Sequence, residues 1–169
     1  CKVAPPWSDW RHERDGIPRM SERAALGWRE WVRLPDLGID ALKAKIDTGA
    51  RTSALHAFEV DAHRRGGEPW VAFRMHPRQR DDSVVLDCEA PVLDVRRVRD
   101  SGGHVTERHV IATRIEIGAH AFDAELTLTA RDDMRFRMLL GRTAMRGRFL
   151  VDPGRSYLIG ERGPRGREG

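Results

Sequence analysis

The feature that most constrains the fold is a series of short runs in which apolar and polar residues alternate, separated by Gly, Pro and Asp. A period of two places successive side chains on opposite faces of a strand, so each run predicts a half-buried β-strand. No stretch has the apolar spacing of a long helix. The pattern occurs at residues 28–34, 39–46, 56–62, 69–75, 83–90, 91–98, 104–117, 121–130, 136–141, 148–152 and 156–160. Taken together, these runs predict about nine or ten strands, and a chain of that many short strands closes into a barrel or a sandwich.

Turn-forming residues join these runs. Residues 35–38 predict a tight turn, and the Gly pair within 64–67 predicts a hairpin because Gly readily adopts positive φ. Ser101, Gly102 and Gly103 predict a second hairpin tip. Residues 142–146 are long enough for one helical turn only, so we expect a single short helix near the C-terminal end of the β region.

The chain of 169 residues has the length of one domain. We expect an extended arm over residues 1–26, a β domain over 27–160, and a disordered tail over 161–169, where only Gly, Pro and charged residues occur. Charged residues make up 33% and hydrophobic residues 40%, which excludes both a membrane-embedded chain and wholesale disorder. We therefore predict no membrane partner.

The two cysteines, Cys1 and Cys88, are too few for a disulfide framework. A reducing compartment fits best, and we expect a cytoplasmic protein. A leading Cys is also what a processed lipoprotein shows, so export to the periplasm stays open, although we expect a trimmed N-terminus.

The sharpest local motif is the segment KIDTGA at residues 45–50. Asp47 follows an apolar strand, and Thr48 and Gly49 form a tight turn after it. Backbone N–H groups of such a turn can face the carboxylate and hold it ionised and oriented. The alternative is an ordinary strand-ending turn, because all three residue types favour turns.

A second motif, Leu139-Leu140-Gly141-Arg142, occurs later in the chain. Together the two motifs resemble those of retropepsin-type aspartic peptidases. Residues 28–159 are similar to a retropepsin-like family that carries the label "ATP-dependent zinc protease". The similarity runs through residues 45–57, 102–111 and 138–153.

The resemblance implies an all-β closed barrel of the retropepsin (acid protease) type with one short helix near the C-terminal motif. It also implies that Asp47, Thr48 and Gly49 are the catalytic residues, with Ala50 packed behind them. An aspartic peptidase needs two carboxylates that share a proton around one water. The chain has a single Asp-Thr-Gly, so the second carboxylate must come from another copy in a two-fold homodimer.

The resemblance also implies that Leu140, Gly141 and Arg142 lie beneath the active-site turn and support it. The segment Ser101, Gly102, Gly103 and His104 lies where retropepsins carry a mobile flap, with a plain hairpin as the alternative.

Arginines near the motifs suggest an acidic substrate. Arg51 departs from the family pattern and brings a cation close to the carboxylate pair, which opposes sharing of a proton. Residues 131–148 hold six Arg and two Asp, a net +4 that equals the net charge of the whole chain. The candidate substrate-binding residues are Arg51, Arg135 and Arg137. A merely solvated face is the alternative, and the lack of interleaved aromatic residues disfavours nucleic acid.

The family label invites a zinc site, but the seven His include no His-Glu-x-x-His pattern. His56 is the His that we expect nearest to the active loop. No phosphate-binding Gly-rich loop with Lys is present either, so we predict neither metal nor cofactor.

Two functions fit these observations. The first is a homodimeric aspartic endopeptidase that cleaves peptides or proteins, with glutamate-rich peptides as candidate substrates because family members are associated with ligases that add glutamate. The second is a non-catalytic module of the same fold that binds acidic peptide or nucleic acid through its arginines.

Overall fold

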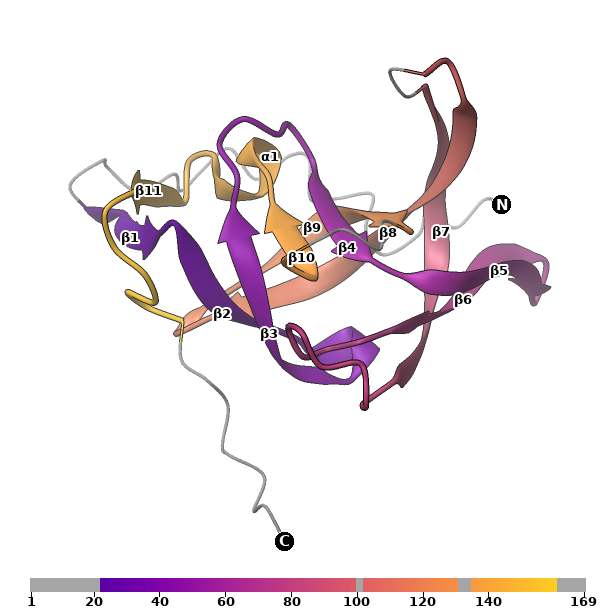
Figure 1. Cartoon of the computed structure of the whole chain (residues 1–169), viewed down its shortest axis with the longest axis horizontal. Coiled ribbons are helices and arrows are strands. Elements are labelled where there is room, and N and C mark those ends of the chain that lie inside the picture. The colour runs from indigo at the N-terminus through magenta and orange to yellow at the C-terminus, as the bar shows by residue number, and fades with distance from the viewer. Residues whose placement is uncertain (1–21, 100–101, 131–134, 161–169) are drawn as a thin grey trace, which may run out of the picture.

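The computed structural model describes residues 22–99, 102–130 and 135–160. In this part of the chain the secondary structure is almost entirely β (Figure 1). The strands are β1 (Ala24–Gly27), β2 (Arg29–Leu34), β3 (Ile39–Ile46), β4 (Ser53–His56), β5 (Phe58–Arg65), β6 (Glu68–Met75), β7 (Leu86–Arg99), β8 (Val105–Ile117), β9 (His120–Thr129), β10 (Met138–Leu140) and β11 (Phe149–Asp152). A 3-10 turn covers Pro35–Leu37.

One α-helix, α1 (Arg142–Met145), occurs in the described ranges, at the place that the sequence predicts. It is far too short to cross a membrane, and no other helix of these ranges could do so.

Six strands form a closed barrel. They follow one another in the order β2-β3-β10-β4-β9-β8, and β8 pairs back with β2 through Arg33 and Glu116. Closure leaves these strands with neighbours on both sides, which removes exposed sheet edges. The expected all-β closed barrel of the retropepsin type is therefore confirmed.

The barrel is filled by the apolar side chains that the alternating pattern places on the inner face. Leu42, Leu55, Ile111, Leu126 and Met138 are completely buried. Cys88 is buried outside the barrel proper, on β7, and its burial raises the pKa of the thiol to about 11.

Strand β7 differs from the expectation. The sequence predicts two strands over residues 83–90 and 91–98, whereas the structure has one long strand that changes partner. Its first half pairs with β6 up to Pro91, and its second half pairs with β8 from Val92 onward. Proline is tolerated where a ladder is interrupted, so Pro91 marks the change of partner rather than the end of a strand.

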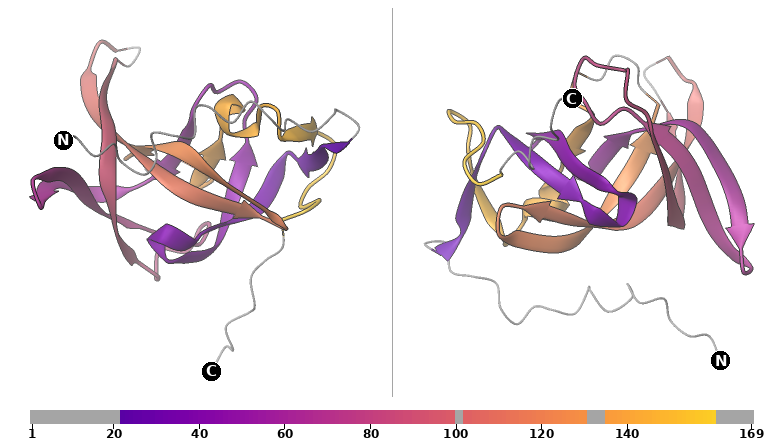
Figure 2. Two further views of the ribbon diagram at one scale, coloured as in Figure 1. Left: turned by 180° about the vertical axis from the view of Figure 1, so that it is seen from behind. Right: turned by 90° about the horizontal axis from the view of Figure 1, so that it is seen from below.

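Beyond the barrel, the sheet continues through β7 to β6 and β5. The β5–β6 hairpin turns at Gly66 and Gly67, both with positive φ, as the sequence predicts. The second hairpin, β7–β8, projects from the barrel as a long arm (Figure 2).

The two ends of the β domain meet in a small sheet that the sequence analysis did not predict. Strand β1, which begins in the segment expected to be an extended arm, pairs in parallel with β11. The run 156–160 was expected to form a strand, and this is wrong. Its backbone instead passes alongside β2, with Tyr157 N–H donating to the Arg29 carbonyl at 2.9 Å.

A buried carboxylate holds this C-terminal segment, residues 155–160, in place. Glu30 is 0% exposed because it shares the inward face of β2 with Val32 and Leu34. Its Oε1 accepts the N–H groups of Gly27 at 2.7 Å and Leu158 at 2.8 Å, and its Oε2 accepts that of Gly160 at 2.9 Å. Three backbone donors thus satisfy a charge that would otherwise be costly to bury.

Candidate active site

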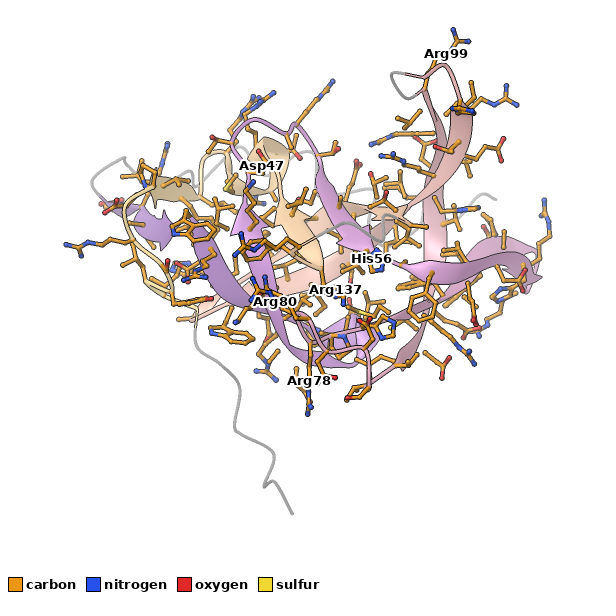
Figure 3. All side chains as sticks on the ribbon, viewed as in Figure 1. Asp47, His56, Arg78, Arg80, Arg99 and Arg137 are labelled. Carbon is orange, nitrogen blue, oxygen red and sulfur yellow. The ribbon has the colours of Figure 1, made fainter. Side chains whose placement is uncertain are left out.

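Asp47 lies directly after β3, in a turn that returns the chain into β4 (Figure 3). Its side chain is half-buried. Oδ1 accepts the backbone N–H of Gly49 at 3.0 Å and that of Ala50 at 3.2 Å. No hydrogen bond from the described residues reaches the other oxygen, Oδ2. The turn therefore orients the carboxylate and leaves one oxygen available for chemistry.

Strand β10 passes beneath this turn, between β3 and β4. The Leu140 carbonyl accepts the Asp47 N–H at 2.9 Å, which attaches the start of the turn to the end of β10. Gly141 follows, and its backbone presses against the far side of the turn. A Cβ at Gly141 would lie 2.5 Å from the carbonyl carbon and oxygen of Thr52, so only Gly fits at this position.

Ser53 completes the attachment. Its side chain is fully buried, and Oγ accepts the Gly141 N–H at 3.0 Å. The sequence analysis did not single out Ser53, because its partner lies 88 residues later and nothing local marks the contact.

Arg142 holds the turn by both its backbone and its side chain. Its N–H donates to the Ala50 carbonyl at 2.9 Å. Its guanidinium Nη1 donates to the carbonyls of Thr48 at 2.9 Å and Gly49 at 3.1 Å. The residues of the two sequence motifs are therefore in direct contact, although the chain between them spans most of the barrel.

The three candidate substrate-binding arginines lie in different surroundings. Arg51 is exposed within the turn itself. Arg137 is only 9% exposed, and its guanidinium binds the carboxylate of Asp82 and the carbonyl of Arg78. Arg135 is exposed, and its carbonyl accepts a hydrogen bond from Gln79.

Position along the strands also separates Arg137 from the turn. It precedes β10, whereas Asp47 follows β3, which runs parallel to β10, so the two residues lie at opposite ends of the strand pair (Figure 3). Within the described residues, Arg142 donates to the Thr48 carbonyl, and the Arg148 guanidinium lies over the ring of Phe122. The charge of the described part of this region, residues 135–148, is thus dispersed rather than gathered beside Asp47.

The flap candidate forms the tip of the β7–β8 hairpin. Ser101 lies outside the described residues, while Gly102, Gly103 and His104 are exposed, and Gly103 has a φ of 84°. In Figure 1 this hairpin and the turn between β3 and β4 both rise at the top of the barrel. The hairpin is solvated toward its tip: Val95 and Val105, on one face, are 46% and 50% exposed, and Thr106, on the other face, is exposed as well.

His56 is buried at the end of β4, away from Asp47 (Figure 3). Its backbone N–H donates to the Arg137 carbonyl at 2.8 Å. Across the described ranges, no three His, Cys, Asp or Glu side chains come together in a way that could hold a metal ion.

Comparison with known proteins gives two kinds of match. A family model described as "Retropepsin-like aspartic endopeptidase RimB" matches residues 25–162. The crystal structure of a Legionella pneumophila protein of unknown function superposes with a TM-score of 0.67 at 26% identity, covering 80% of this chain and 98% of that one.

Curated relatives carry a different name. Proteins called "Probable alpha-L-glutamate ligase" are 48% identical over 136 residues in Shewanella halifaxensis and 46% identical over 142 residues in Parasynechococcus marenigrum. These matches cover 80% and 84% of this chain but only 30% of each relative. The chain therefore corresponds to less than a third of these longer proteins.

Proposed function

The chain belongs to the RimB-like family of retropepsin-like aspartic endopeptidases, and we propose that it hydrolyses peptide bonds with two copies of Asp47, one from each subunit of a homodimer. The observation that carries this proposal is the Asp47 turn. Its carboxylate is oriented through Oδ1 by two backbone N–H groups, and Oδ2 has no described partner. One such turn per chain supplies half of an aspartic peptidase site.

The chemistry follows from bringing two carboxylates together. Two adjacent carboxylates cannot both ionise easily, so the pair holds one proton. The ionised member takes a proton from a water as the water attacks the peptide carbonyl. The protonated member donates to the carbonyl oxygen, and the tetrahedral intermediate then breaks with transfer of a proton to the leaving amine.

The two-fold homodimer is part of the proposal, because the chain contains a single Asp-Thr-Gly. Two-fold symmetry places the same residue of each subunit at the axis, which is the simplest way to form a carboxylate pair from one motif. The half-buried position of Asp47 and the exposure of Thr48 and Gly49 leave the turn accessible to a second copy.

We infer that the substrates are acidic peptides rich in glutamate. The relatives named glutamate ligases contain a segment like this chain, so the two activities would meet on the same type of polymer. Arg51 supports this choice, since it exposes a guanidinium four positions after Asp47. Guanidinium groups bind carboxylates with two parallel hydrogen bonds.

The direct test replaces Asp47 by Asn, which keeps the size of the side chain but removes its charge. Peptides of a glutamate-rich library are incubated with the protein, and the products are identified by mass spectrometry. We expect cleavage to fall by about three orders of magnitude, with an unchanged thermal unfolding curve. The matched control is Asp40→Asn, an exposed Asp on β3 that should leave cleavage unchanged.

Mixing the parent with the Asp47→Asn variant tests the dimer. After subunit exchange at equal amounts, only about a quarter of random dimers contain two Asp47 residues. Compared with the parent alone at the same total concentration, activity should therefore fall to roughly a quarter. It would fall to half if each chain acted independently. Cleavage by the Asp47→Asn variant alone at the rate of the parent would refute the proposed peptidase function. Tight binding of acidic peptides without cleavage would support the non-catalytic module instead, with Arg51 as its first candidate contact.

A further inference from the structure

Arg142 and Asp47 face each other across two peptide groups of the turn. The guanidinium Nη1 donates to the carbonyls of Thr48, at 2.9 Å, and Gly49, at 3.1 Å. The N–H groups of these same two peptide units belong to Gly49 and Ala50. Both N–H groups donate to Asp47 Oδ1, at 3.0 Å and 3.2 Å. The cation is therefore joined to the carboxylate by two hydrogen-bonded relays, each through one peptide group.

Such an arrangement strengthens every bond in it. A peptide unit is a dipole with its positive end at N–H and its negative end at C=O. A cation on the carbonyl oxygen polarises the unit further, and its N–H becomes a better donor to an anion. Here the cation and the anion lie at the correct ends of both dipoles.

We propose that Arg142 is a positioning residue whose charge acts on Asp47 through these two peptide groups, which fixes Oδ1 as the bound oxygen and leaves Oδ2 for the reacting water. Arg142 touches neither the carboxylate nor a substrate in this role. The proposal rests on the peptidase function proposed above, because it assigns Arg142 a part in that reaction.

The surroundings of Arg142 favour this role over an ordinary ion pair. In the described parts of the chain, its side chain contacts carbonyl oxygens and no carboxylate. The residue directly after Ala50 is Arg51, a cation, so this position of the turn offers no carboxylate to the guanidinium. The backbone of Arg142 is anchored as well, since its N–H donates to the Ala50 carbonyl and Gly141 is wedged against Thr52.

The experiment compares Arg142→Met, which removes the charge and the donors, with Arg142→Lys, which keeps a charged donor. Arg146→Met is the matched control, because Arg146 is an exposed Arg next to the same short helix and makes no described contact with the turn. Two readouts are used. The first is kcat and KM on a cleaved glutamate-rich peptide. The second is the NMR chemical shift of the amide protons of Gly49 and Ala50, which reports the strength of their hydrogen bonds.

For Arg142→Met we expect kcat to fall about tenfold while KM stays within about twofold, and both amide protons to move upfield. Arg142→Lys should recover part of kcat and part of the shift, and Arg146→Met should change neither. All variants are compared well below their unfolding temperatures, so a lower stability alone does not change kcat.

Unchanged amide shifts in folded Arg142→Met, or an unchanged kcat, would overturn the proposal. If the Asp47→Asn variant cleaves as fast as the parent, the proposed peptidase function is refuted, and with it the catalytic part of this inference. In that case the amide shifts still decide the relay: shifts that move in both Asp47→Asn and Arg142→Met support it, and shifts that move in neither refute it.

Discussion

Replacing Glu30 by Ala removes the buried carboxylate that ties the C-terminal segment 155–160 to β2. Three backbone N–H groups, those of Gly27, Leu158 and Gly160, then lose their acceptor in a region where Glu30 is 0% exposed. Each buried and unsatisfied donor costs about 1–3 kcal/mol. Three such donors sum to about 3–9 kcal/mol, and water entering the space left by the side chain offsets part of this cost, so we expect the free energy of unfolding to fall by about 3–6 kcal/mol.

Urea unfolding followed by circular dichroism measures this change, at one protein concentration because the stability of the proposed dimer would depend on concentration. Glu30→Gln is the informative second variant. It keeps one carbonyl oxygen, but its NH₂ group must face a backbone donor, so we expect an intermediate loss. Glu107→Ala is the matched control, since Glu107 is an exposed Glu on β8 and its ion pair with Arg97 is solvated.

Amide hydrogen exchange locates the effect. Exchange of the Leu158 and Gly160 amides should accelerate in Glu30→Ala more than exchange in β4 or β9. A loss below about 1 kcal/mol for Glu30→Ala would refute the reasoning, because three buried donors cannot lose a charged acceptor at so small a cost.

Two further substitutions or reactions test the packing around the turn and the outer sheet. Gly141→Ala places a Cβ 2.5 Å from the Thr52 carbonyl. We therefore expect the free energy of unfolding, measured with urea, to fall by about 3 kcal/mol or more, and cleavage to be lost. A variant as stable as the parent would contradict the close approach. Burial raises the pKa of the Cys88 thiol to about 11, so the thiol stays protonated at pH 8. Iodoacetamide should therefore modify Cys88 only after unfolding, as followed by mass spectrometry. Rapid modification of Cys88 in the folded protein would contradict its burial.

The strands were largely predictable because their signal is local. Alternation predicted β3, β6, β8 and β9 nearly to their ends, and Gly pairs predicted both hairpins. The expected resemblance to the retropepsin-like family is confirmed by the family match, and the closed barrel by the strand pairing. Strand β1 and the C-terminal segment 155–160 escaped prediction, since both owe their conformation to partners at the other end of the chain.

The candidate site was predictable in part. The motifs singled out Asp47, Gly141 and Arg142, which lie together in the structure. Ser53 and Glu30 were missed. For Glu30 a signal was present, because a charged residue shares the inward register of β2 with Val32 and Leu34. An acidic residue on an otherwise apolar face predicts a buried carboxylate with dedicated donors.

By itself, the sequence determined that the chain forms strands, that one Asp-Thr-Gly turn ends an apolar strand, and that this motif occurs once in the chain. These properties depend on backbone geometry and on residues that are neighbours along the chain. Only the tertiary structure decided what each arginine does. Arg137 is buried against Asp82, Arg142 binds the carbonyls of the Asp47 turn, and Arg51 stays exposed. A charge takes its role from the groups that folding brings within hydrogen-bond distance, and these groups lie far away in the sequence.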